Sequence, residues 1–387
     1  MKLSVLLPTR NGAHFLPGCL DAVFDQTDAS IELVVSDNAN EDGTREILRK
    51  YSRPNLTVVR QDSILSVTDN WTAALDAATG DYLWMVGDDD LVLPGAASWL
   101  MMQLESYGWP DCLSFGAYSY IAPGGLSGGA PAYWAPDHFR YGEAVSSGER
   151  LSESTRKRLV VDLFRFRAGL PLNMQLTVFS KEAVSKAKAP FFRAPFPDHY
   201  ALASMLLTAG PWFYSDYRPL VVGVSPKSFG HYFYSGQGAA GLGYLGSDYP
   251  LPRDALPGNE LLSLMYAWLV LLDEVYPDEL HDFHISRGDY VARQVWSWLV
   301  DLRLGRIGNA EILNRLGLIR LVDLWEMGRL VGSGDFWMLA GRRLSRLVGS
   351  RAGATVSLQW AGLSPIEHAQ TISEFARLVT SGGLARP

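Results

Sequence analysis

The first hundred residues alternate between strand-like apolar runs and segments whose apolar residues have helical spacing. The apolar runs are Leu3–Thr9, Ile31–Asp37, Leu56–Gln61 and Tyr82–Val86. The helical patterns between them are Ala13–Asp25, Thr44–Tyr51 and Val67–Ala78. Strand and helix in alternation predict βαβ units, and therefore an α/β fold with a mostly parallel sheet and helices on both faces.

Polar side chains follow three of these runs, at the point where each strand is expected to end. Thr9 ends the first run and Asn11 follows it, Asp37 ends the second, and Asp88–Asp90 follow the fourth. In open parallel sheets, ligands bind outside the carboxyl ends of the strands. We therefore expect a ligand site at this edge of the sheet.

The three consecutive acids Asp88, Asp89 and Asp90 end the run LWMVG and precede LVLP. Neighbouring unit charges a few Å apart repel by roughly 1–4 kcal/mol per pair, depending on how much water surrounds them. Three adjacent acids can form a solvated turn, cap a helix or bind a hard cation. Their place after a buried strand favours Mg²⁺ or Mn²⁺, which takes one or two carboxylates together with substrate phosphate oxygens.

Four motifs, LSVLLPTRN, VVSDNANEDGT, TDNWTAALDAATGDY and LWMVGDDDLVLP, resemble in order and spacing those of family-2 glycosyltransferases of the GT-A fold. The resemblance is close over residues 1–110 and loose over 111–250. It implies a metal-dependent inverting enzyme that moves a sugar from a nucleoside-diphosphate sugar, expected to be a UDP-sugar. The implied acceptor is a hydroxyl of a glycan or lipid-linked glycan, in polysaccharide or cell-envelope biosynthesis.

The resemblance also implies roles for individual residues. Pro8 and Thr9 would line the nucleobase pocket, Asp37 would contact the base, and an acidic DxD motif would hold the diphosphate through Mn²⁺ or Mg²⁺. The commoner family motif has four positions, Asp-x-Asp-Asp, and here Gly87 stands at the first acid. We therefore expect the metal ligand to be Asp89 or Asp90. The expected donor-binding residues are Pro8, Thr9, Asn11, Asp37, Asn70 and Asp88.

Two further residues complete the implied site. Inverting transfer needs a general base for the acceptor hydroxyl, and the family places an acid before a helix, where this chain has Asp198 in PFPDHYALASMLLTAG. Asp198 alone would be taken for a helix cap, but with the motifs upstream we favour the base. His231, in SFGHYF, is the candidate third metal ligand, although a histidine beside aromatic residues is also often simply packed in a core.

Beyond the first hundred residues the pattern changes twice. Residues 122–143, APGGLSGGAPAYWAPDHFRYGE, predict a long irregular loop, and helical patterns continue from about residue 255 almost to the end. We therefore predict a nucleotide-sugar-binding half at 1–110, an acceptor-binding half at 111–254 and a helical C-terminal domain at 255–387. Residues 303–351 carry nine arginines and four acids. We favour a helical bundle or homo-oligomer interface for them over a peripheral membrane surface.

Composition limits the alternatives. The net charge of −7 argues against nucleic acid as a partner, and no signal peptide or apolar run of about 18–20 residues is visible. We expect a cytoplasmic protein, at most peripheral at the membrane. Two rival functions are a sugar nucleotidyltransferase, for which PTRNGAHF offers little of a triphosphate loop, and a non-catalytic glycan-assembly protein retaining the nucleotide-binding fold.

Overall fold

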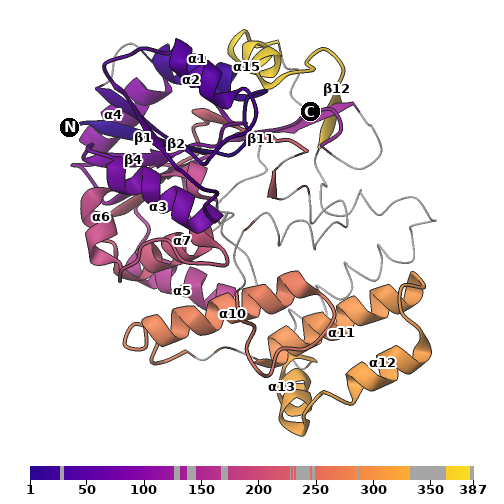
Figure 1. Cartoon of the computed structure of the whole chain (residues 1–387). Helices are drawn as coiled ribbons and strands as arrows, with labels where there is room; N and C mark the ends of the chain where they lie inside the picture. The colour runs from indigo at the N-terminus through magenta and orange to yellow at the C-terminus, as the bar shows by residue number, and fades with distance from the viewer. Residues whose placement is uncertain are drawn as a thin grey trace. The chain divides into compact units, whose positions relative to one another are not determined.

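The structure is a computed structural model (Figure 1). The chain forms two compact units, each described separately below. It describes residues 1–26, 30–125, 131–136, 145–166, 173–226, 228–229, 231, 245, 249–283, 285, 287–331 and 363–383. Unit 1 comprises Met1–Lys157, Leu170–Ser247 and Gly362–Pro387, and unit 2 comprises Arg158–Gly169 and Asp248–Ala361. The end of the chain thus belongs to unit 1 and not to the unit that precedes it.

Unit 1 is built on a seven-stranded sheet in the order β10-β6-β9-β4-β1-β2-β3. Only β9 is antiparallel to its neighbours among these pairs; the others run parallel. The mostly parallel α/β sheet predicted from the sequence is therefore confirmed. The strands are β1 Leu3–Thr9, β2 Ile31–Asp37, β3 Leu56–Arg60, β4 Tyr82–Met85, β6 Cys112–Phe115, β9 Thr177–Ser180 and β10 Trp212–Ser215.

Helices cover both faces of this sheet, as the strand–helix alternation predicts. Side chains alternate along a strand, so Leu3, Val5 and Leu7 of β1 share one core with α1 and α4, whereas Ser36 of β2 points to α3 on the other face. α3 packs against β1, β2 and β3. The helices of unit 1 are α1 Leu16–Phe24, α2 Thr44–Lys50, α3 Val67–Ala77, α4 Ala96–Ser106, α6 Lys181–Lys186 and α7 Pro197–Thr208, with a 3₁₀ turn at Met174–Leu176. Helix α5, Glu153–Phe164, begins in unit 1 and ends in unit 2.

A second sheet has the order β12-β8-β7-β11-β5. One of its strands corrects the sequence analysis: β8, Ala132–Ala135, lies inside the predicted irregular loop and pairs antiparallel with both β7 and β12. The Gly and Pro residues around β8 are typical of loops, and they hid this short strand in the sequence. The strands are β5 Leu91–Val92, β7 Tyr118–Ile121, β8, β11 Leu220–Val224 and β12 Ser364–Ile366.

The second sheet joins the acidic triplet to the far end of the chain. β5 begins immediately after Asp90 and pairs antiparallel with β11. The C-terminal helix α15, Ile372–Thr380, packs against both β5 and β11, and it is the yellow helix beside α1 in Figure 1. The last described residues therefore support the strand that follows the acids.

Phe375 is the centre of this support, and we expect its replacement to be costly. Its side chain is fully buried, and its ring lies 5.3 Å from that of Tyr120 and 5.8 Å from that of Trp134. Phe375→Ala should lower the free energy of unfolding by about 3–5 kcal/mol, because it leaves a cavity among aromatic rings. Urea denaturation measures this, with exposed Met102→Ala as the control; an unchanged midpoint would contradict the packing role.

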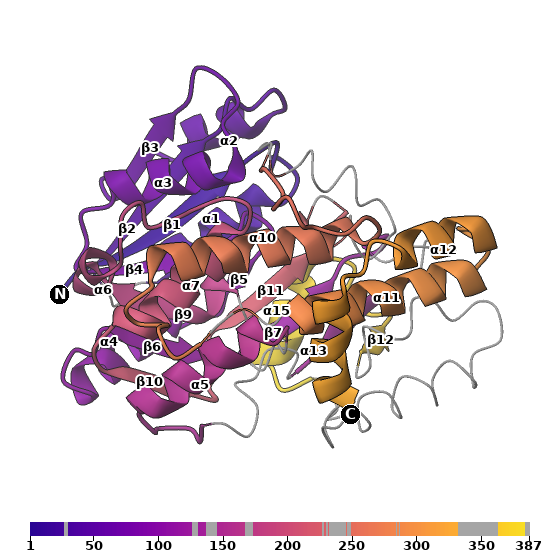
Figure 2. The same cartoon turned by 90° about the horizontal axis from the view of Figure 1, so that it is seen from below.

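Unit 2 is helical, with the elements drawn in orange in Figure 2. Asn259 caps α10, its side chain accepting a hydrogen bond from the backbone N–H of Leu262 at 3.1 Å. Trp268 of α10 and Trp298 of α11 are fully buried. No helix in the described part of the chain is long and apolar enough to cross a membrane. The helices are α10 Glu260–Val275, α11 Arg287–Arg303, α12 Asn309–Leu316 and α13 Leu321–Val331.

Candidate functional site

The carboxyl ends of β1, β2 and β4 meet at one edge of the large sheet. β1 pairs with β2 so that Thr9 lies opposite Asp37 and Pro8 opposite Ser36, and β4 runs parallel on the other side of β1. Thr9 and Asp37 are both buried, and Pro8 is half-buried. The parallel register thus brings together the polar side chains that the sequence leaves scattered.

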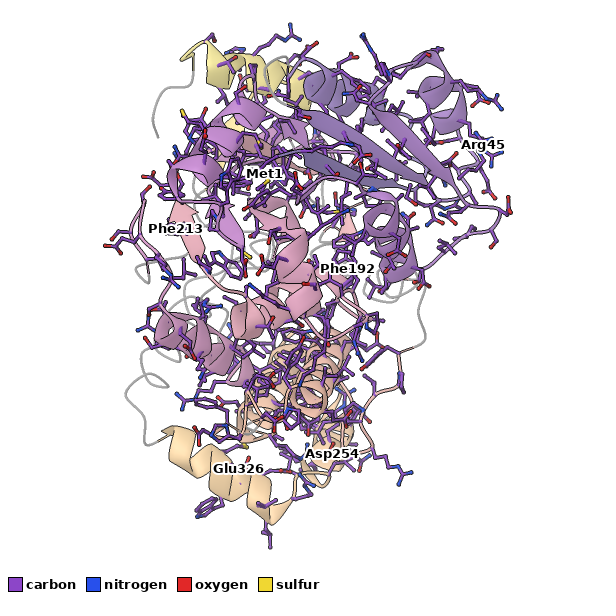
Figure 3. All side chains as sticks on the ribbon, turned by 90° about the vertical axis from the view of Figure 1, so that its left-hand side faces the viewer. Met1, Arg45, Phe192, Phe213, Asp254 and Glu326 are labelled. Carbon is purple, nitrogen blue, oxygen red and sulfur yellow. The ribbon has the colours of Figure 1, made fainter. Side chains whose placement is uncertain are left out.

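Asp37 lies fully buried at the end of β2. One carboxylate oxygen, Oδ1, accepts a hydrogen bond from Nδ2 of Asn40 at 2.7 Å. The other, Oδ2, lies 3.4 Å from Nε of Arg60 and 3.5 Å from Nε of Arg45; Arg45, on α2, is labelled in Figure 3. The two arginines offset the cost of burying this charge. Asp37 therefore orders the loop after β2, and its expected contact with a nucleobase stays a prediction.

The turn after β1 brings Thr9 against the first acid of the triplet. The hydroxyl of Thr9 donates to Oδ2 of Asp88 at 2.5 Å. Gly12 lies against the same pair, and a Cβ at this position would overlap both Asp88 Oδ2 and Thr9 Oγ1. Only glycine fits here without moving Asp88. Sequence reasoning missed Gly12, because no local pattern shows that an acid 76 residues later will approach it.

Asn11 and Asn70 have supporting positions in the same region. Asn11 has the left-handed φ of 53°, which Asn tolerates better than most residues, and its side-chain Oδ1 accepts from the backbone N–H of Glu41 at 3.0 Å. Asn70, buried on α3, accepts a hydrogen bond from Oγ of Ser36 at 2.7 Å. The first residue ties the β1 turn to the β2 loop, and the second ties α3 to β2.

Asp90 is the buried member of the triplet, and both of its oxygens bind backbone. Oδ2 accepts from the N–H of Gly87 at 2.7 Å, and Oδ1 accepts from the N–H of Gly223 on β11 at 2.9 Å. Burial, and next the charge of Asp89, raise the pKa of Asp90. These contacts connect the acidic turn to the second sheet, so Asp90 has a structural role.

Asp89 is only half-buried and binds a different segment. Its Oδ2 accepts a hydrogen bond from the hydroxyl of Ser228 at 2.7 Å. Burial raises the pKa of Asp89, and the hydrogen bond from Ser228 opposes that rise. Ser228 was missed from the sequence, because no local pattern shows that its hydroxyl will contact an acid 139 residues earlier.

Ser228 lies close along the chain to His231. We use the name 225–231 segment for the described residues of this stretch, which are Ser225, Pro226, Ser228, Phe229 and His231. The backbone N–H of His231 donates to the carbonyl of Ser228 at 2.9 Å, and its ring Nδ1 lies 2.7 Å from the carbonyl oxygen of Gly125. Within the described residues, no group of three or more His, Cys, Asp and Glu side chains is placed to hold a metal ion. His231 lies on the segment that contacts Asp89, and its role as a metal ligand stays a prediction.

The 225–231 segment also contacts the residues before Asp198. The rings of Phe229 and Phe196 have centroids 6.1 Å apart, and Phe196 is the N-cap residue of α7. Asp198 lies inside the first turn of α7, not at the cap, and its Oδ1 accepts from the backbone N–H and lies 2.9 Å from ring Nδ1 of His199. The N-cap alternative for Asp198 thus has no support, and the 225–231 segment packs on Phe196, the residue that precedes α7.

The acidic turn fits a divalent cation by its chemistry. Burial raises the pKa of Asp89 and of Asp90, so a cation beside them would favour the ionised carboxylates. Mg²⁺ commonly binds one or two carboxylates and completes its shell with substrate phosphate oxygens and water. A cluster of three protein ligands is therefore not required at such a site.

Comparison with known proteins finds matches to part of the chain. Residues 4–123 match the model of glycosyl transferase family 2. A PGL/p-HBAD biosynthesis glycosyltransferase of Mycobacterium bovis is 37% identical over 22% of this chain and 35% of that protein. Abequosyltransferase RfbV of Salmonella typhimurium is 32% identical over 27% of this chain and 33% of that protein. The match thus spans about a third of the length of these relatives.

Solved structures also align with the chain, at low identity. TarS of S. aureus in complex with UDP-GlcNAc aligns over 74% of this chain and 75% of that chain, with 16% identity and a TM-score of 0.47. Glucosyl-3-phosphoglycerate synthase from Mycobacterium tuberculosis, in complex with Mn²⁺, UDP and glucosyl-3-phosphoglycerate, aligns over 58% and 70%, with 16% identity and a TM-score of 0.34.

Proposed function

We propose that this protein, whose residues 4–123 match the model of glycosyl transferase family 2, transfers a sugar from a nucleoside-diphosphate sugar to an acceptor hydroxyl. The donor is proposed to be a UDP-sugar and the acceptor a glycan or lipid-linked glycan. The observation that supports this most is that residues from distant parts of the chain contact the acidic turn. There, Thr9 binds Asp88, and the 225–231 segment contacts both Asp89 and the residues before Asp198.

The donor is proposed to lie across the ends of β1, β2 and β4. Pro8, Thr9 and Asp37 would face the nucleoside, with Asn11 and Asn70 holding the surrounding loops in place. Asp88 is held by Thr9 and would contact the ribose or a water molecule. Mn²⁺ or Mg²⁺, when bound, supplies positive charge to the departing diphosphate. Asp89 is the proposed ligand for it, with His231 as the second candidate, because Asp90 already binds two backbone N–H groups.

The chemical step needs a base on the acceptor side. The acceptor oxygen attacks the anomeric carbon, the bond from that carbon to the diphosphate oxygen breaks, and the nucleoside diphosphate leaves from the opposite face. Asp198 takes the proton from the acceptor hydroxyl as the new bond forms. Its Oδ1 is engaged by His199, so Oδ2 is the oxygen proposed to receive this proton, and the sugar configuration is inverted.

Calorimetry with UDP, GDP and TDP, each with and without Mn²⁺, tests the donor site. UDP is expected to bind at least about tenfold more tightly with Mn²⁺, because each carboxylate that must approach the diphosphate otherwise repels it. Sugar derivatives of each nucleoside diphosphate that binds are then assayed for metal-dependent hydrolysis in the absence of an acceptor. Absence of metal-dependent binding for all three diphosphates would overturn the proposed function, and tighter binding of GDP or TDP would overturn only the choice of uridine.

A further inference from the structure

The proposed base Asp198 is held through one of its two carboxylate oxygens. Oδ1 accepts a hydrogen bond from the backbone N–H of His199 at 2.8 Å and lies 2.9 Å from ring Nδ1 of the same residue. Helix α7 begins at Pro197, and its N-cap residue Phe196 makes no side-chain capping hydrogen bond. The first N–H groups of a helix have no partner within the helix, so the carboxylate of Asp198 supplies one for His199.

The contact between the ring and the carboxylate has a defined direction. A carboxylate oxygen only accepts hydrogen bonds, so at 2.9 Å the proton lies on Nδ1 of His199 and Nδ1 is the donor. Two donors of one residue, the backbone N–H and the ring N–H, therefore meet the same oxygen of Asp198. The carboxylate cannot rotate about its Cβ–Cγ bond without breaking these hydrogen bonds, so the position of Oδ2 is fixed as well.

The imidazole ring of His199 is itself supported by a neighbouring side chain. Its centroid lies 5.2 Å from that of the Phe196 ring, and Phe196 is buried. The side chains of His199 and Asp198 each keep 25% of their surface exposed. The pair is therefore accessible from outside the protein, while the ring that donates to Oδ1 packs on a buried aromatic residue.

We propose that His199 is a positioning residue for the base, an inference that rests on the proposed function. By donating from Nδ1 to Oδ1, the ring holds the carboxylate of Asp198 in one orientation. Oδ2 then receives the proton of the acceptor hydroxyl without a prior rotation of the side chain. A displacement of about 1 Å at a reacting group can cost about a hundredfold in rate, so loss of this hydrogen bond should lower kcat and leave donor binding unchanged.

Three substitutions of His199 test which property of the side chain matters. Leucine has no donor, the amide nitrogen of asparagine is bonded to Cγ as Nδ1 is in histidine, and the amide nitrogen of glutamine lies one bond farther out. His199→Leu should lower kcat by about 10- to 100-fold. His199→Asn should stay within about fivefold of the unaltered protein, because its N–H can reach Oδ1, whereas His199→Gln should resemble His199→Leu.

The measurement is the Mn²⁺-dependent hydrolysis of the nucleotide sugar that the unaltered protein accepts, with water in place of the acceptor hydroxyl. KM for this donor should change by less than about twofold in all three variants, because the effect is on the chemical step. The matched control is His281→Leu in unit 2, where ring Nε2 of His281 lies 3.1 Å from Oδ2 of the neighbouring Asp282. This variant removes a similar contact between adjacent residues and should leave kcat unchanged.

The outcomes distinguish this inference from the proposed function. If the unaltered protein hydrolyses no nucleotide sugar, the proposed function is overturned and this inference with it. If the unaltered protein is active and His199→Leu has the same kcat, only the positioning role is overturned. Equally large losses in all three variants would also overturn it, and would indicate that the ring takes the proton in place of Asp198. The comparison of His199→Asn with His199→Gln decides the matter even where His199→Leu is unstable, because both amides are polar and differ only in reach.

Discussion

The Asp198→Asn variant is expected to lose about a thousandfold in turnover, within the 10²–10⁴ range contributed by a positioned general base. The asparagine side chain has nearly the same shape but cannot accept the proton of the acceptor hydroxyl. Metal-dependent UDP binding should stay within about twofold, because the proposed contacts to the nucleoside and diphosphate come from residues at the ends of β1, β2 and β4 and not from Asp198. Hydrolysis of the donor, in which water replaces the acceptor, provides the measurement before the acceptor is identified.

Two controls distinguish a loss of catalysis from a loss of helix stability. A first-turn acid stabilises a helix by about 0.3–1 kcal/mol, so Asp198→Asn should scarcely change the unfolding midpoint. Glu182, the first-turn acid of α6, is the matched residue, and Glu182→Gln should leave turnover unchanged. If Asp198→Asn kept near-normal turnover with an unaltered pH profile, Asp198 would not be the base.

The second large expected effect distinguishes the roles of the adjacent acids Asp89 and Asp90. Asp89→Asn should weaken metal-dependent UDP binding by at least about a hundredfold, because it removes the proposed anionic ligand, while the unfolding midpoint stays the same. Asp90→Asn should lower the free energy of unfolding by about 1–3 kcal/mol, because the amide cannot accept from both Gly87 and Gly223. Calorimetry with UDP and Mn²⁺ measures the first, and urea denaturation the second.

The contrast between the two variants is the decisive outcome. Asp89→Asn with normal metal-dependent binding would move the ligand role to Asp90 or Asp88. A stable Asp90→Asn variant would show that its two backbone hydrogen bonds contribute little to the fold. Ser228→Ala serves as an intermediate control, since it removes the hydroxyl that donates to Asp89 Oδ2 but leaves the carboxylate.

Much of the large sheet could be predicted because its signals are local. β1 and β2 have the limits expected from the apolar runs, and the helices between the strands lie where the apolar spacing places them. A strand in a parallel sheet is buried on both faces and shows as a continuous apolar run. β8 and β12 were harder, because they have only four and three residues, β8 lies between Pro131 and Pro136, and β12 contains Pro365.

By itself the sequence determined the order of strands and helices, the edge at which polar residues collect and the presence of three acids there. Only the tertiary structure decided how those acids divide their tasks. Asp90 binds the N–H of Gly223, 133 residues away, and Asp89 binds Ser228, 139 residues away. The physical reason is that these partners are delivered by the pairing of β5 with β11, a long-range contact that leaves no periodic trace in either segment.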